Sequence, residues 1–166
     1  MAETLNLISL DVWLGAVEEG LREVAREAMG QPDLEVTKRT AVIPEKMPGA
    51  FIPLMAPEES VQVGLVSTPE GAQKMARAML QMGPGEALSQ ADLADALGEA
   101  ANILAGFVKR NMQVHLKSVQ LGLPLYVNGH LETTERVRAM VTHLQMGKIP
   151  VAVVVLRAAT YMAKAA

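Results

Sequence analysis

The sequence predicts an α+β fold in which an antiparallel β-sheet packs against long α-helices. Apolar residues recur every three or four positions in three segments, which is typical of amphipathic helices. Other segments are rich in β-branched residues and are bounded by Pro, Gly and short polar residues, as antiparallel strands are. The order is one helix, three strands, two helices and roughly three more strands, so helices and strands are grouped rather than alternating. A chain of 166 residues suits one domain with one core, and we treat residues 1–166 as a single domain.

Composition excludes several classes of function. The net charge is −3 and aromatic residues make up 3% of the chain, so neither a basic nucleic-acid surface nor base stacking is indicated. The chain has no cysteine, which excludes disulfides, thiol nucleophiles and thiolate metal sites. The first residues lack the basic flank of a secretory signal, and no apolar stretch is long enough to span a membrane. We therefore expect a cytoplasmic protein that does not insert into membranes.

The first helix is expected over residues 9–29. Glu and Arg fill its polar faces, as they do on a solvated helix surface. Gly30 and Pro32 then end the helix. Its apolar positions follow steps of four and three, which predicts one buried side: Leu10, Leu14, Val17, Leu21, Val24 and Ala28.

Three strands are expected next, at residues 34–43, 50–56 and 60–67. The turn "PEKMPG" separates the first two, and all three segments contain β-branched residues. Pro53 has no N–H to donate to a neighbouring strand, so it predicts that the second strand lies at an edge of the sheet.

The second helix is expected over residues 67–83. Ser67 or Thr68 can cap its first turn, and Pro69 suits the position that follows a cap. The run Gly83-Pro84-Gly85 ends it. That run lacks the lysine and the spacing of a phosphate-binding loop, so we interpret it as a linker.

The third helix is expected to start at Ser89, with Asp92 three residues later as in a capping box. The rest of the chain is β-rich, with a segment at 117–129 and two long segments at 136–146 and 149–158. Gly147-Lys148 joins the last two as a hairpin. The apolar run 151–156 needs cover on both faces, which favours a homodimer.

The third helix, which includes "DALGEAANILAGFVKRNM", carries the most unusual face. At about 100° per residue, Glu99, Asn102 and Gly106 fall within roughly 40° of Asp95. The opposite side is apolar: Leu93, Leu97, Ala101, Leu104 and Val108. The helix therefore has one buried wall and one narrow polar strip that faces outward.

A solvated surface is the simplest interpretation of this strip, and it stays open. Gly98 and Gly106 count against it, because each glycine costs about 1 kcal/mol relative to alanine in an exposed helix interior. Asn102 also has a lower helix propensity than the Gln or Lys of an ordinary surface. Glycines beside a short amide and a carboxylate let the backbone of another molecule approach closely. We therefore predict that Asp95, Gly98 and Gly106 contact a partner.

The spacing of this strip resembles the signature of the CheC/CheX/FliY phosphatases of bacterial chemotaxis. That signature is an acid or Ser, three residues, Glu, two residues and Asn, followed by apolar and small residues that include Ala-Gly. Here it reads Asp95, Glu99 and Asn102, with Ala105-Gly106 behind. The amino-terminal helix, the strand "VQVGLVS" running into "TPEGAQKMARAML", and "PLYVNG" are similar to the CheX arrangement in the same order. The resemblance covers most of the chain.

CheC and FliY carry two such motifs and CheX carries one. Glu3 and Asn6 have the same spacing, but they precede the first helix and lack the following Ala-Gly, so we attribute them to chance. A single motif makes the chain similar to CheX. The resemblance implies a homodimer, joined through strands of the two sheets, that dephosphorylates a CheY-like response regulator.

The resemblance also implies the roles of the residues. The substrate would be a phosphorylated aspartate of a regulator that supplies its own Mg²⁺ and lysine, so no cofactor of this chain is expected. Asn102 would orient the attacking water, and Glu99 would pair with the regulator's lysine. Asp95, at the acid-or-serine position, would help to dock the partner or only be solvated.

Two other functions compete with this hypothesis. A dimeric adaptor could bind a response regulator or another signalling protein without hydrolysing its phosphate, although an adaptor would not need the amide. A metal-dependent hydrolase fits poorly, because His115, His130 and His143 lie on separate segments without ligand spacing, and no metal site is predicted. Which regulator is the substrate, and in which pathway, stays open.

Overall fold

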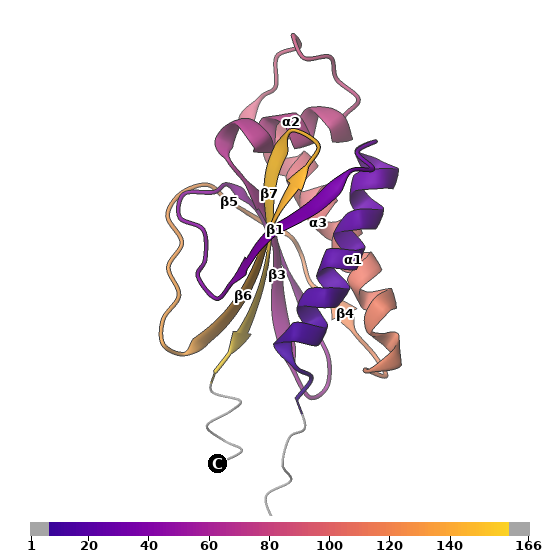
Figure 1. Ribbon diagram of the computed structural model, residues 1–166, viewed down its shortest axis with the longest axis vertical. Helices are drawn as coiled ribbons and strands as arrows, with labels where there is room; N and C mark the ends of the chain where they lie inside the picture. Colours follow the sequence, from indigo (N-terminus) through magenta and orange to yellow (C-terminus); the bar gives the residue numbers. More distant parts are fainter. Residues whose placement is uncertain (1–6, 160–166) are drawn as a thin grey trace, which may run out of the picture.

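The computed structural model describes residues 7–159 as one antiparallel sheet with a layer of helices on one face (Figure 1). This is the predicted α+β fold. The helices are α1 (Leu10–Ala28), α2 (Pro69–Met79) and α3 (Gln90–Asn111), and a short 3₁₀ turn, η1 (Met112–Val114), follows α3. None of the helices in this part of the chain is long and apolar enough to cross a membrane. The strands are β1 (Leu34–Thr40), β2 (Gly49–Met55), β3 (Ser60–Ser67), β4 (Gln120–Leu121), β5 (Leu125–Val127), β6 (Val137–Met146) and β7 (Ile149–Ala158).

The sheet has the strand order β1-β6-β7-β3-β2-β4, and β5 also pairs with β2. Every pairing is antiparallel. The two longest strands, β6 and β7, form the predicted hairpin, and Gly147 takes the left-handed conformation (φ 59°) that its tight turn requires. β7 lies between β6 and β3, so the most apolar segment of the chain is at the centre of the sheet.

The main core lies between the sheet and the helices. The predicted apolar side of α1 packs there, with Leu14, Val17, Leu21 and Val24 at most 3% exposed. α1 and α3 lie side by side on the sheet (Figure 1). A β-carbon at Gly20 would lie 3.0 Å from a methyl group of Leu104 and 3.4 Å from Phe107 and Val108. The small residue at this position therefore lets the two helices approach closely.

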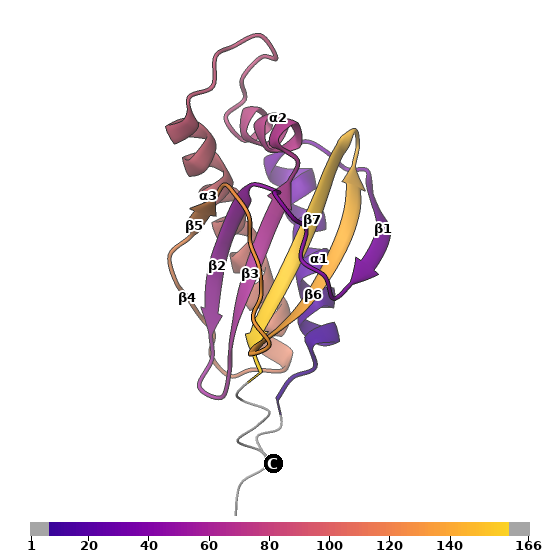
Figure 2. The same ribbon diagram turned by 90° about the vertical axis from the view of Figure 1, so that its left-hand side faces the viewer.

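The other face of the sheet is covered by the chain itself. Figure 2 shows the β1–β2 and β5–β6 connections running across it. A second apolar cluster lies beneath them, in which Ala152 and Val154 of β7 are fully buried, with Ile43, Met47 and Leu131 packed against it. The run 151–156 thus has cover on both faces within one subunit. The apolar run therefore no longer indicates a homodimer, because it needs no cover from a second subunit. Only the family resemblance still supports a homodimer.

The sequence context of Pro53 predicted that its strand lies at an edge of the sheet. In the structure this strand, β2, has neighbours on both sides. β2 pairs with β3 on one side and with β4 and β5 on the other. The carbonyl of Pro53 accepts a hydrogen bond from the N–H of Gly122, so the ring nitrogen faces the same side. That side is the break between β4 and β5, where no strand requires an N–H. The prediction of an edge strand is therefore wrong, because the gap that accommodates Pro53 lies inside the sheet.

Several expected boundaries also differ from the structure. The strand expected at residues 34–43 is β1, which ends at Thr40. α2 ends at Met79 rather than near Gly83, because Gln81 adopts a left-handed backbone (φ 54°) that stops the helix earlier. Residues 117–129 form two short strands, β4 and β5, rather than one, since residues 122–124 between them do not form a strand.

A buried ion pair ties the start of α1 to the end of β7. The carboxylate of Glu59 lies 3.0 Å from the guanidinium of Arg157, and both side chains are at most 9% exposed. The same carboxylate accepts hydrogen bonds from the backbone N–H of Ile8 and the indole N–H of Trp13. Three donors, two from the start of α1 and one from the end of β7, therefore converge on one buried acid.

Candidate functional site

The site is built on α3, whose start is the predicted one. Ser89 is the N-cap, and its hydroxyl accepts a hydrogen bond from the N–H of Asp92 at 3.1 Å. The predicted buried wall is confirmed. Every member of it is at most 5% exposed: Leu93, Leu97, Ala101, Leu104 and Val108. This wall fixes the rotation of α3 about its axis and so decides which side chains face outward.

The opposite strip is exposed. Asp95, Glu99, Asn102 and Gly106 are all exposed residues of α3, and we call these four the ridge. Within residues 7–159, no hydrogen bond or ion pair joins the side chain of Asp95, Glu99 or Asn102 to another residue. A carboxylate and a carboxamide that lie one helical turn apart are thus available to another molecule.

The two glycines of the predicted partner-binding set have different surroundings. A β-carbon at Gly106 would meet nothing within 4 Å, so a partner could approach the backbone there. Gly98 is buried, and a β-carbon would lie 3.6 Å from Pro124 of the same chain. Gly98 therefore has an internal neighbour, and its direct contact with a partner stays a prediction.

A small hollow of about 300 Å³ lies beside the ridge. Asp95, Gly98 and Glu99 line it from α3, and Pro124 and Tyr126 line it from the segment at β5. The hydroxyl oxygen of Tyr126 is enclosed and has no hydrogen-bond partner among the described residues. Burial also raises the pKa of this phenol. The sequence pattern of α3 does not identify Pro124 and Tyr126 as site residues, because only the pairing of β5 with β2 brings them to this helix.

The three histidines do not form a site. His115 is exposed, and His130 lies 2.8 Å from the carboxylate of Glu132, which raises the pKa of the imidazole. Burial lowers the pKa of His143, and nearby Lys38 lowers it further. Across residues 7–159, no group of three or more His, Asp or Glu side chains could hold a metal ion.

A cavity of about 760 Å³ lies elsewhere, between α2 and the β6–β7 hairpin. Neither Glu99 nor Asn102 lines it. The ridge is instead a projecting surface beside a shallow hollow. Such a surface cannot enclose a small substrate, but it can enter a depression on another macromolecule. Its chemistry suits a partner that supplies its own pocket: the amide can both accept from and donate to a water molecule, and the carboxylate can pair with a cation.

Comparisons with known proteins agree on one family. A family model described as "Chemotaxis phosphatase CheX" matches residues 49–145, which is more than half of the chain and includes the ridge. A CheC-like superfamily protein from Shewanella sp. PV-4 has a TM-score of 0.74 at 12% identity, over 88% of this chain and 97% of that one. CheX from Vibrio vulnificus has a TM-score of 0.71 at 14% identity, over 86% and 97%.

A third solved structure contains a partner. The CheX-CheY-BeF3-Mg²⁺ complex from Borrelia burgdorferi includes a chain that matches with a TM-score of 0.67 at 15% identity, over 92% of this chain and 98% of that one. At these identities the structures show a shared fold. No curated protein matches the sequence.

Proposed function

Since the chain belongs to the CheX family, we propose that it is a phosphatase that hydrolyses the phospho-aspartate of a CheY-like response regulator. Glu99 and Asn102 enter the regulator's active site from α3. The main support for this proposal is the ridge. There, the carboxylate of Glu99 and the amide of Asn102 lie one helical turn apart, and both are exposed and have no partner among residues 7–159. The complex of a similar CheX with CheY from Borrelia burgdorferi supports a partner of this class.

This reaction needs few catalytic groups from the phosphatase. Transfer of a phosphoryl group depends mostly on positioning and on stabilising charge, both of which favour a fixed helix. The carbonyl oxygen of Asn102 accepts a hydrogen bond from a water molecule and holds it in line with the phosphorus. The water oxygen forms the new bond to phosphorus while the bond to the aspartyl oxygen breaks. Inorganic phosphate leaves with the protons of the water, and the regulator regains its carboxylate.

The other ridge residues dock the regulator. Glu99 pairs with the regulator's active-site lysine, one turn before Asn102. The regulator holds the Mg²⁺ that neutralises the phosphoryl oxygens, so this chain needs no cofactor of its own. Asp95 extends the acidic surface by a further turn, and Gly106 lets the regulator's backbone approach α3.

Substitution of the two central residues separates hydrolysis from binding. Asn102→Ala should leave binding of the regulator nearly unchanged while phosphate loss falls to the regulator's own rate. Glu99→Ala should weaken both binding and turnover. The measurement follows phosphate loss from phosphorylated CheY-type receiver domains of the encoding organism, with and without Mg²⁺, and binding is measured in parallel.

The outcomes distinguish the enzyme from an adaptor. Full acceleration by Asn102→Ala would show that the roles are wrong. Binding of the phosphorylated regulator by the unsubstituted chain, with no acceleration of phosphate loss, would instead identify the chain as an adaptor.

We also propose that the protein is a homodimer in solution, as the resemblance to CheX implies. β1 is the outermost strand at one end of the sheet and pairs only with β6, so one of its sides is free of a strand within the described chain. Light scattering at micromolar concentration measures the mass directly, and a monomer there contradicts the proposal.

A further inference from the structure

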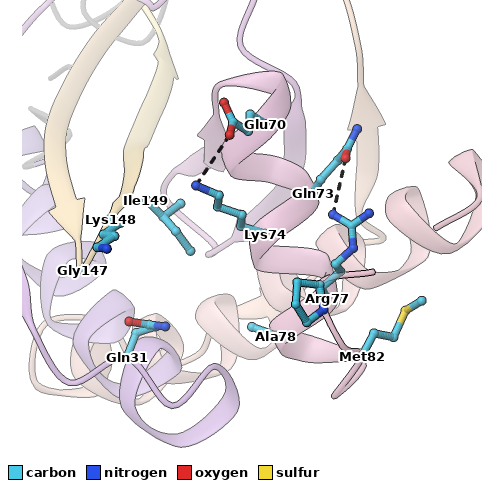
Figure 3. Close-up of a pocket in the computed structure, with 11 residues that line it drawn as sticks. Gln31, Glu70, Gln73, Lys74, Arg77, Ala78, Met82, Gly147, Lys148 and Ile149 are labelled. Carbon is cyan, nitrogen blue, oxygen red and sulfur yellow. Dashed lines mark hydrogen bonds and ion pairs between the residues drawn. The ribbon is translucent and has the colours of Figure 1, made fainter. Parts of the chain in front are cut away.

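The 760 Å³ cavity between α2 and the β6–β7 hairpin is cationic and takes no part in the proposed phosphatase reaction. We call it the α2 cleft. Figure 3 shows its polar side chains: Lys74 and Arg77 come from α2, and Lys148 comes from the tip of the hairpin. Glu70 is the single carboxylate that lines it among the described residues. Three cations against one acid give this lining a positive charge, although the net charge of the chain is −3.

The walls of the α2 cleft are held in place by backbone hydrogen bonds. The N–H of Gly147 donates to the carbonyl of Asp33, which fixes the hairpin tip to the connection after α1. The N–H of Gln31 donates to the carbonyl of Ala25 at the end of α1. The N–H of Met82 donates to the carbonyl of Arg77, so the segment after α2 is tied back to the helix. The cleft therefore exists before any ligand enters, as binding sites for small molecules commonly do.

The cations of the α2 cleft are weakly engaged within the chain. Lys74 pairs with Glu70 at 3.7 Å, and the Glu70 side chain is 83% exposed, so this pair contributes little. The guanidinium of Arg77 makes two long bonds of 3.4 Å, to the side-chain oxygen of Gln73 and to the carbonyl of Glu86. Its Nε is enclosed and has no partner among the described residues. An anion in the cleft would give the Lys74 ammonium and the two terminal nitrogens of Arg77 better acceptors than they have now, whereas the enclosed Nε is out of its reach.

The α2 cleft is also partly apolar. Ala78, Met82, Pro84 and Ile149 line it, and Gln31 and Gln73 add amides that can donate and accept hydrogen bonds. A bare inorganic anion would leave this surface uncovered. A volume of about 760 Å³ lies within the range for organic ligands rather than single ions.

We propose that the α2 cleft binds an organic phosphate of mononucleotide size. The phosphate lies between Lys74 and Lys148, and the organic body covers Met82 and Pro84. Arg77 and the two amides bond to polar atoms of that body. The inference stands apart from the phosphatase proposal, since it uses no residue of the ridge.

Calorimetric titration of the full chain tests the proposal with AMP, ADP, adenosine, inorganic phosphate and an Asp/Glu-rich peptide as probes. AMP or ADP should saturate at submillimolar concentration in roughly 50 mM salt and weaken as salt rises. Adenosine and inorganic phosphate should each bind at least about tenfold more weakly, which is about 1.4 kcal/mol. The double variant Lys74→Ala/Lys148→Ala should weaken nucleotide binding by at least about tenfold.

The matched control is Lys109→Ala/Lys117→Ala, which removes the same charge from exposed positions outside the cleft. Nucleotide binding lost in the cleft variant and kept in the control supports the proposal. The proposal is overturned if neither AMP nor ADP saturates the protein by about 1 mM, or if adenosine binds as well as AMP. It is also overturned if both double variants lose nucleotide binding equally, or if only the acidic peptide binds. Phosphatase activity is not the readout, so either proposal can fail without the other.

Discussion

Gly106→Ala tests whether Gly106 lowers the stability of the protein while allowing the regulator to contact α3. Gly106 lies inside the 22-residue helix α3, is exposed, and has open space around the position of a β-carbon. A methyl group therefore meets no internal obstacle. Alanine is favoured over glycine in a helix interior by about 1 kcal/mol, partly because glycine has more freedom in the unfolded chain. We expect the free energy of unfolding to rise by about 1 kcal/mol and Tm to rise by roughly 2–4 °C.

The same methyl group should interfere with the regulator. A well-packed contact that must accept an extra carbon loses about 1–3 kcal/mol. The KM for the phosphorylated regulator should therefore rise at least about fivefold, with kcat little changed, since Asn102 is untouched. Urea unfolding and thermal unfolding measure the first effect, and initial rates of phosphate release measure the second.

Gly15→Ala is the matched control. Gly15 is exposed on α1, and a β-carbon there also meets nothing within 4 Å, so the stability gain should be similar. Its KM should equal that of the unsubstituted chain. If Gly106→Ala gains no stability, the helix argument is wrong. If both variants gain stability and neither changes KM, Gly106 does not contact the regulator.

Two further predictions concern the fold. Glu59→Gln should lower the free energy of unfolding by about 3–5 kcal/mol, measured by urea unfolding, because the buried guanidinium of Arg157 loses its counter-charge; a loss under about 1 kcal/mol contradicts this. The Arg39 guanidinium and the Thr142 hydroxyl both bond to Glu18 and hold the pKa of that carboxyl below its usual value. Because the folded pKa is the lower one, this stabilisation is fully present above the pKa that the carboxyl has in the unfolded chain, and it is lost as pH falls through the folded pKa. Tm measured from about pH 6 to pH 3 should therefore fall less steeply for Glu18→Gln, and an unchanged slope would refute the linkage.

Much of the fold follows from local patterns. The steps of three and four in α1 and α3 predicted their buried sides, because periodicity depends only on helix geometry. Ser89 predicted the start of α3, since a cap acts within one turn. Gly147-Lys148 predicted the β6–β7 hairpin for the same local reason.

The ridge was predictable for a related reason. Asp95, Glu99 and Asn102 lie on one helix, so their common direction follows from about 100° per residue, and the opposite apolar wall predicted that they face outward. Their catalytic and docking roles come from the family resemblance and stay predictions until the variants are measured.

Sequence alone therefore determined which segments form helices and strands and which face of α3 projects, because these depend on neighbours along the chain. Only the tertiary structure decided what meets across the chain. It placed Pro53 at a break inside the sheet, covered the outer face of β7 with the chain's own loops, and brought Tyr126 to the flank of α3. It also joined Lys74 and Arg77 to Lys148 around one cleft. Such contacts depend on strand order and loop paths, and no periodicity within a single segment encodes them.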